Sequence, residues 1–253
     1  MSGHSKWSTI KHAKAITDAR RGKLFTKLAR EIIISARQGG GDVDMNIRLR
    51  MAVQKAKDAN MPNDNIERAI KRGTGEGGDA EQMVEFIYEG YGPGGIAIML
   101  ETLTDNRNRT VSDVRSTLTK AGGNLAQSGA VAWQFQQKGI VVVTAEEDTA
   151  EELTLIAIDA GAEDFDSFDS TLQIFSPPES LESIRSTLHD SEASIVSSEL
   201  SMIPTSTISL DDKTAKQTLK LLDQLEDLDD VQKVYSNADF SDSVLEEYQG
   251  EQS

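Results

Sequence analysis

The spacing of the apolar residues changes at a glycine-rich segment, residues 73–78, and this change constrains the fold more than any other feature. Before the segment, apolar residues recur at intervals of three and four, which is typical of amphipathic helices. After it, short runs of alternating apolar and polar residues are separated by helical stretches, which is typical of strands that combine with helices. We therefore expect a helical domain followed by α/β domains.

The part of the chain before residue 73 predicts three short helices. The first covers residues 23–38 and ends at three consecutive glycines, since glycine adopts the left-handed conformation that closes a helix. The second covers residues 46–59 and ends before Pro62, and the third begins at Asn63 or Asp64. Short helices with short connections are typical of a small bundle. A helix-turn-helix DNA reader is one such bundle, but the periodicity identifies no recognition helix.

The remainder predicts two α/β domains, one inserted into the other. Residues 80–130 and 205–237 each give an incomplete set of strands and helices. The stretch between them gives a complete set, which begins with a hairpin whose turn is at residues 137–139. We therefore expect an α+β protein, in which an N-terminal three-helix domain is followed by two α/β plait-like domains, the third inserted into the second.

Five parts of the chain follow from this division. They are a basic N-terminal arm (residues 1–21), a helical bundle domain (22–78), an α/β domain in two segments (79–130 with 204–240), an inserted α/β domain (131–203) and an acidic tail (241–253).

Charge is distributed unevenly along the chain, whose formal net charge is −16. Residues 1–75 contain 16 Lys and Arg against 7 Asp and Glu, whereas residues 144–253 contain 5 against 27. Such a division is typical of a basic end that faces nucleic acid and an acidic body that repels phosphate elsewhere. The alternative is that the basic end attracts the acidic end of the same chain, or is simply a solvated face.

The arm and the first helix carry most of the predicted nucleic-acid contacts. Cations of the arm would neutralise phosphates, and Trp7 would stack on a base unless it anchors the arm onto the next helix. On the helix, four cations fall on one face, opposite most of the apolar residues: Lys23, Lys27, Arg30 and Arg37. Ile34 interrupts this cationic face. A row of cations on one helical face can follow a phosphate backbone.

Two further cations, Arg107 and Arg109, stand at the start of a later helix, where the helix dipole disfavours positive charge. They serve an anionic partner, or they pair locally with Asp105 or Asp113. The predicted nucleic-acid-binding residues are Lys6, Trp7, Lys11, His12, Lys14, Arg20, Arg21, Lys23, Lys27, Arg30, Arg107 and Arg109.

A search for an active site gives no catalytic residues, no cofactor and no metal site. The chain has no cysteine, which excludes thiolate chemistry, and its three histidines lack the spacing of a helical metal motif. A G-x-G-x-x-G match at residues 73–78 follows a helix rather than a strand, so we discount it as a phosphate loop. No apolar run reaches the ~18 residues of a membrane span. We expect a soluble cytoplasmic protein that is not an enzyme and does not bind membranes.

Ten short motifs resemble those of the YebC/PmpR family, in family order. They are GHSKW (3–7), IKH (10–12), RGK (21–23), FTKL (25–28), REI (30–32), NMP (60–62), NIERAIKRG (65–73), YEGYGPGG (88–95), TDNRNRT (104–110) and GGNL (122–125). The resemblance implies a three-domain α+β fold. It also implies a cytoplasmic, DNA-binding transcriptional regulator or a translational activator, and it supplies no catalytic residues.

Three hypotheses remain. The first is a DNA-binding transcriptional regulator, and the second is a ribosome-associated translation factor that binds ribosomal RNA through shape and backbone. The third is an acidic interaction protein or an enzyme without a recognisable motif. Both of the first two need a cationic face, and the family's usual description favours the first. The oligomeric state is left open.

Overall fold

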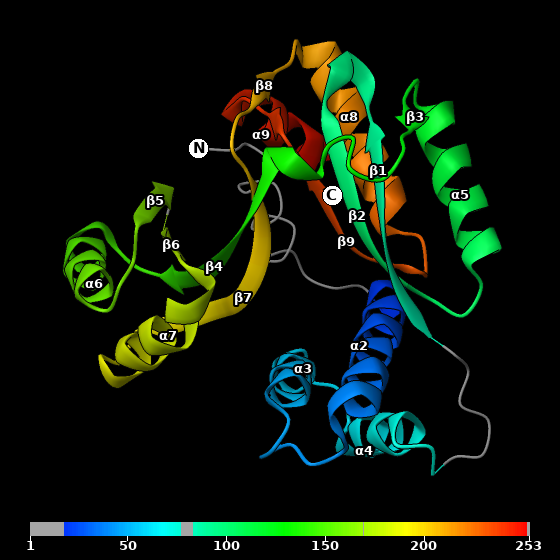
Figure 1. The fold of residues 1–253 in the computed structure, drawn as a ribbon. Coiled ribbons are helices and arrows are strands. Elements are labelled where there is room, and N and C mark those ends of the chain that lie inside the picture. Colours follow the sequence, from blue (N-terminus) through cyan, green and yellow to red (C-terminus); the bar gives the residue numbers. More distant parts are fainter. Residues whose placement is uncertain (1–17, 77–82, 169, 252–253) are drawn as a thin grey trace.

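The computed structural model of the chain describes residues 18–76, 83–168 and 170–251. The described chain begins with three helices, as predicted, and they form a domain of their own (Figure 1). These are α2 (Asp18–Gly39), α3 (Ile47–Asp58) and α4 (Asn63–Gly73). The second helix begins where its sequence predicts, because the side chain of Asn46 accepts a hydrogen bond from the N–H of Leu49 as an N-cap. Helix α2 begins earlier than expected, so residues 18–21 of the predicted arm are helical.

The second domain is an antiparallel sheet with helices on one face. The sheet has the order β3-β1-β2-β9. Its strands and helices are β1 (Val84–Tyr91), a 3-10 turn (Pro93–Gly95), β2 (Ala97–Thr104), α5 (Arg107–Lys120), β3 (Asn124–Leu125), α8 (Asp212–Glu226) and β9 (Val231–Ser236), with the short parallel pair β8 (Ile208–Ser209) and β10 (Ala238–Asp239) beside it. Ile98 and Leu100 alternate with Ala97 and Met99, so the first pair packs under α5 and α8 and the second pair packs on the opposite face.

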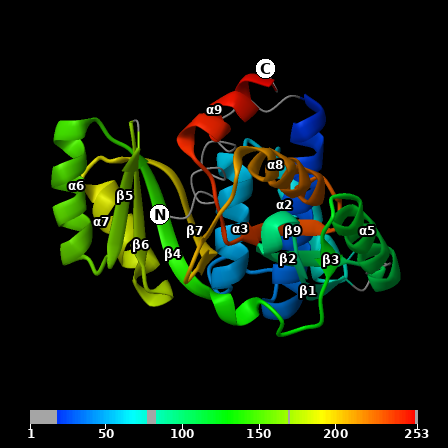
Figure 2. The same cartoon turned by 90° about the horizontal axis from the view of Figure 1, so that it is seen from above.

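The third domain is a separate four-stranded antiparallel sheet of order β5-β6-β4-β7. Its elements are a 3-10 turn (Ala132–Gln134), β4 (Phe135–Thr144), α6 (Glu147–Asp159), β5 (Asp164–Phe168), β6 (Thr171–Ser176), a 3-10 turn (Pro178–Ser180), α7 (Leu181–Asp190) and β7 (Ser194–Pro204). The chain leaves the second domain after β3 and returns to it at β8, which confirms the predicted insertion. In Figures 1 and 2 this domain lies to one side of the other two.

The predicted hairpin at the start of the third domain is wrong. Residues 135–144 form one continuous strand, and Gly139, which suggested a turn, lies inside it, paired with Ser176. The glycine is needed for close packing, since a Cβ at this position would lie 2.6 Å from the Ser176 Oγ and 2.9 Å from the Leu181 Cβ. The third domain is therefore β-α-β-β-α-β.

A buried carboxylate on β1 holds the connection between the second and third domains. Glu89 accepts hydrogen bonds from the backbone N–H groups of Gly129, Val131 and Ala132 at 2.6, 2.7 and 2.8 Å. The connecting loop is thereby tied to the sheet from which it departs.

The segment expected to be an acidic tail is a helix that packs against the second domain. Residues 242–251 form helix α9 (Asp242–Glu251), and its Val244 and Leu245 are buried in the core of the second domain. Tyr248 adds a hydrogen bond from its hydroxyl to the Asp223 carboxylate of α8, at 2.7 Å. The segment is acidic only on its exposed side, and its apolar side completes the core.

Candidate nucleic-acid interface

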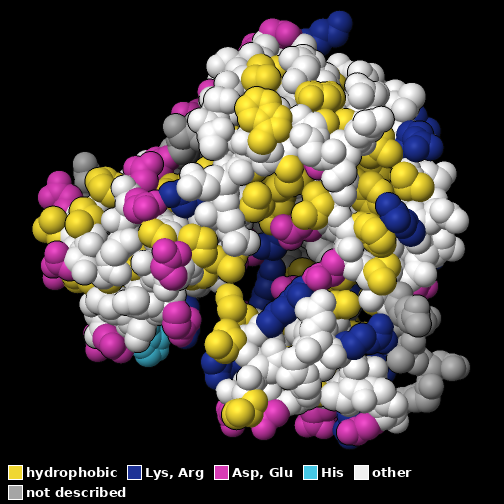
Figure 3. Space-filling model, viewed as in Figure 1, with side chains coloured by type: hydrophobic (Ala, Val, Ile, Leu, Met, Phe, Trp, Pro, Cys, Tyr) yellow, Lys and Arg dark blue, Asp and Glu magenta, His cyan; other side chains and the backbone are white. Residues whose placement is uncertain are grey.

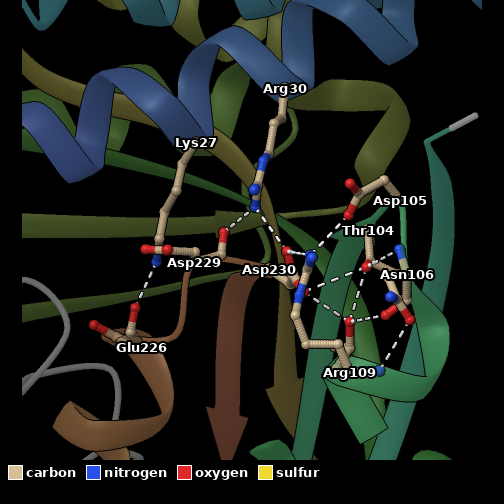
Figure 4. Close-up of polar contacts among 10 residues, drawn as sticks. Lys27, Arg30, Thr104, Asp105, Asn106, Arg109, Glu226, Asp229 and Asp230 are labelled. Atoms are coloured by element: carbon tan, nitrogen blue, oxygen red, sulfur yellow. Dashed lines mark hydrogen bonds and ion pairs between the residues drawn. The ribbon is translucent and has the colours of Figure 1, made fainter. Parts of the chain in front are cut away.

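The predicted cationic face of α2 faces the second domain rather than open solvent. Ile34 shares this face with Lys23, Lys27 and Arg30, and it is buried against Met83 and Leu103. The apolar residue that interrupts the cationic row in the sequence is therefore the docking point of the helix. The three cations around it meet the loop that follows α8 (Figure 4).

Lys23 and Lys27 contact the C-terminal end of α8. The Lys27 Nζ donates to the Glu226 carbonyl at 2.6 Å, and the Lys23 Nζ lies 3.4 Å from both the carbonyl and the carboxylate of Asp227. The last carbonyls of a helix have no partner within the helix and carry partial negative charge. The two lysines therefore cap α8 from another domain.

Arg30 completes the contact through the next residues of the loop. Its guanidinium donates to the Asp229 carbonyl and, at 3.1 Å, to the Asp230 carboxylate. The side chain of Arg30 is 16% exposed and that of Asp230 is 7% exposed, so water screens this pair little. The contact joins the helical domain to the second domain.

Asp230 is also the partner of residues at the start of α5. The Arg109 guanidinium lies 2.9 Å from this carboxylate, and the Thr110 hydroxyl donates to it at 2.8 Å. Arg109 pairs with Asp105 as well, at 2.7 Å, so it has one of the local partners that the sequence offered. The hydrogen bonds that Arg109 donates to Asp230 and then to Asp105 raise the pKa of Arg109, and the bond to Asp105 lowers the pKa of that carboxyl.

The neighbouring Arg107 has a different position. Its guanidinium lies over the ring of Phe86, 4.1 Å from the centroid, and the residue is exposed. Although both arginines come from one turn of α5, the structure brings only Arg109 to the Asp230 carboxylate. Arg107 is held on an aromatic face and remains accessible.

The other predicted contacts divide between exposed residues and residues outside the description. Arg21 and Lys23 are exposed on the first turns of α2. Lys6, Trp7, Lys11, His12 and Lys14 lie outside the described residues, and the side chain of Arg20 is not described.

Exposed cations on the other two helices extend the basic surface of the helical domain. Figure 3 shows Lys and Arg side chains over the helical domain, with Asp and Glu along its lower edge, whereas Asp and Glu predominate on the third domain. The exposed cations on α3 and α4 are Arg48, Arg50, Lys57, Arg68, Lys71 and Arg72. The sequence pattern places the α4 cations on the side away from its buried Ile66, and this was the signal that could have added them to the predicted site.

The described part of the chain offers neither a metal-binding cluster nor a membrane-spanning helix. Residues 18–76, 83–168 and 170–251 contain no group of three or more His, Asp or Glu side chains placed to hold a metal ion. Among the helices of the same residues, none is long and apolar enough to cross a membrane.

Comparisons with known proteins agree over nearly the whole chain. A family model described as the TACO1/YebC protein N-terminal domain matches residues 5–76, and one described as the TACO1/YebC second and third domain matches residues 83–238. A probable transcriptional regulatory protein of Dehalococcoides mccartyi is 56% identical over 249 residues, covering 98% of each chain. One of Natranaerobius thermophilus is 52% identical over 251 residues, covering 97% of this chain and 99% of the relative. The crystal structure of a conserved hypothetical protein, Aq1575, from Aquifex aeolicus has a TM-score of 0.85 at 48% identity, covering 94% of this chain and 98% of that one.

Proposed function

The chain belongs to the TACO1/YebC family, and on this premise we propose that it regulates transcription by binding DNA, without catalysing a reaction. Relatives at 52–56% identity over almost the full length carry the name probable transcriptional regulatory protein. The fold class, three helices followed by two sheet domains, is shared with the Aquifex aeolicus structure over the 94% of this chain that the two have in common.

One observation supports nucleic-acid binding above the others: the segregation of charge between domains. Exposed cations gather on the helical domain, whereas residues 144–253 carry 27 Asp and Glu against 5 Lys and Arg. A phosphate backbone is repelled by the acidic part and attracted to the basic part, so the helical domain and the arm before it form the binding end.

The predicted contacts take part in two ways. The arm residues, together with the exposed Arg21 and Arg107, meet phosphates directly. Four further cations already contact carbonyl or carboxylate oxygens of the protein, so each meets a phosphate only by exchanging those oxygens for phosphate oxygens. They are Lys23, Lys27, Arg30 and Arg109. Binding therefore competes with the contact between α2 and the loop after α8.

The test is DNA binding by fluorescence anisotropy at two salt concentrations. Lys23→Glu with Lys27→Glu should abolish binding. A matched double variant, Lys120→Glu with Lys213→Glu, changes the net charge equally on exposed positions of the second domain and should retain it. Wild-type affinity should fall at least about tenfold between ~50 and ~200 mM salt. Because Lys27 also contacts α8, the thermal unfolding of each variant is recorded to establish that it is folded.

The physiological target is identified by crosslinking in cells, followed by sequencing of both DNA and RNA. Enrichment of discrete promoter DNA, lost in the Lys23→Glu, Lys27→Glu variant, supports the proposal. Enrichment of one locus of ribosomal RNA contradicts transcriptional regulation and identifies the translation factor that the sequence left as the alternative.

A further inference from the structure

An open groove of about 260 Å³ lies between α2 and α4, on the helical domain. Its floor is apolar and includes Phe25, Ala29 and Met61. Polar side chains of α4, namely Asn65, Arg68 and Arg72, also line it, and the lining residues that the structure describes include no acidic one.

Short side chains leave this space open. Ala29 on α2 and Ala69 on α4 both line the groove and reach only to Cβ. Near the end of α4, Gly73 brings the two helices into contact, since a Cβ there would lie 2.5 Å from the Ile33 carbonyl oxygen. The helices therefore pack closely beside the groove without filling it.

We propose that the groove receives one unstacked base of a single-stranded nucleic-acid segment, with the adjoining phosphates on Arg68 and Arg72. This inference rests on the proposed function and specifies the form of nucleic acid that the helical domain recognises. A base in a duplex is stacked and cannot enter, so the site selects single strands or locally opened ones.

The chemistry of the lining fits each part of a nucleotide. An aromatic ring with apolar neighbours offers a stacking surface that every base can use, and Phe25 supplies the ring. The Asn65 amide can donate to and accept from a base edge. Arg68 and Arg72 are four residues apart, so they share one face of α4, and planar guanidinium groups bind phosphate oxygens in pairs.

The size of the groove limits its occupant. Sites for complete small-molecule ligands begin at about 300 Å³, so this groove suits one planar ring system better than an extended cofactor. An apolar peptide side chain would also fit the floor. The two guanidinium groups in the lining favour a polyanion.

The test compares two 12-unit single strands of equal charge: ordinary DNA, and an abasic strand that has the sugars and phosphates but no bases. The wild-type protein should bind the base-bearing strand at least about tenfold more tightly than the abasic strand, because stacking acts only on the first. A duplex of the same sequence should bind more weakly than the single strand at the same salt concentration.

Two uncharged variants examine the groove itself. Ala29→Leu fills it and Phe25→Leu removes the aromatic ring, and each should lower affinity for the base-bearing strand several-fold while leaving the abasic strand unaffected. Arg68→Glu should lower the affinity for the base-bearing strand more than Lys71→Glu does, since Lys71 is exposed on the same helix but does not line the groove. Thermal unfolding checks that each variant is folded, and either uncharged variant suffices if the other is not.

The outcomes separate this inference from the proposed function. Equal binding of base-bearing and abasic strands, or full affinity in Ala29→Leu, overturns the groove as a base site even when salt-sensitive DNA binding persists. In that case the groove is open to a protein side chain instead. If the wild-type protein binds no nucleic acid of any form, the proposed function itself is wrong.

Discussion

The loss of the Asp230 carboxylate should destabilise the protein more than any other single change in the contact between the helical and second domains. The side chain is 7% exposed and interacts with Arg30, Arg109 and Thr110. The substitution Asp230→Ala leaves two guanidinium groups without their shared acceptor. Removing one partner of a buried ion pair costs about 3–5 kcal/mol. Because the Arg109 side chain is 45% exposed and regains water, we expect the lower end, about 3 kcal/mol.

Thermal unfolding followed by circular dichroism measures this effect. For a chain of this size about 3 kcal/mol corresponds to a fall in Tm of roughly 6–12 °C. Asp229→Ala is the matched control, because its side chain is exposed and the Arg30 contact is to its backbone carbonyl, which the substitution keeps. The control should stay within about 0.5 kcal/mol of wild type. Equal Tm values for the two variants would refute the argument that the buried carboxylate holds the domains together.

Three further predictions concern single positions. Burial raises the pKa of Glu89, but its three backbone N–H donors outweigh this and leave the pKa below its ordinary 4.5. The carboxylate therefore stabilises the fold above about pH 4.5, and that contribution is lost as the pH falls through the folded value. In urea unfolding measured from pH 7 to pH 3, Glu89→Gln should lower the free energy of unfolding at pH 7 by about 1–3 kcal/mol. The variant should also lose less of that free energy than the wild type as the pH falls, and an equal loss would contradict this. In the same assay Gly73→Ala should lower the free energy of unfolding by about 1–3 kcal/mol, because the new methyl group meets the Ile33 carbonyl. Gly22→Ala should raise it by about 0.5–1 kcal/mol, because a Cβ there meets nothing within 4 Å. Leu245→Ala should cost about 2–5 kcal/mol in calorimetry if α9 belongs to the core, and a change below about 0.5 kcal/mol would show that it does not.

The sequence predicted best those elements whose ends have a local chemical cause. Asn46 caps α3 and Asn106 caps α5, and each lies within a residue or two of the predicted start. The turn between β1 and β2, at residues 92–95, also has a local cause, since Gly94 has a φ of 72° that other residues rarely adopt. Signals of this kind act within a few residues, so sequence reasoning finds them directly.

The failures came from residues whose role depends on distant parts of the chain. Gly139 suggested a turn, but a glycine is needed there because the Ser176 side chain, on another strand, leaves no room for a Cβ. Val244 and Leu245 were too few for an amphipathic pattern, and their burial depends on a core made by α8 and the sheet. In both cases the deciding contact is tertiary, so no window of local sequence contains it.

The candidate site shows why charge alone does not identify a ligand. The row of Lys23, Lys27 and Arg30 predicts a surface that attracts oxygen anions, and the structure offers it such oxygens from within the chain. Several of these are backbone carbonyls at the end of α8, which any sequence can supply and which no motif reveals. Ile34 was the distinguishing residue, because an apolar side chain in the middle of a cationic face has no use on a phosphate backbone and has one in a docking surface. The same reasoning leads to α4, where Arg68 and Arg72 line an open groove together with the half-buried Phe25 of α2, so an apolar surface beside cations is offered there to a ligand.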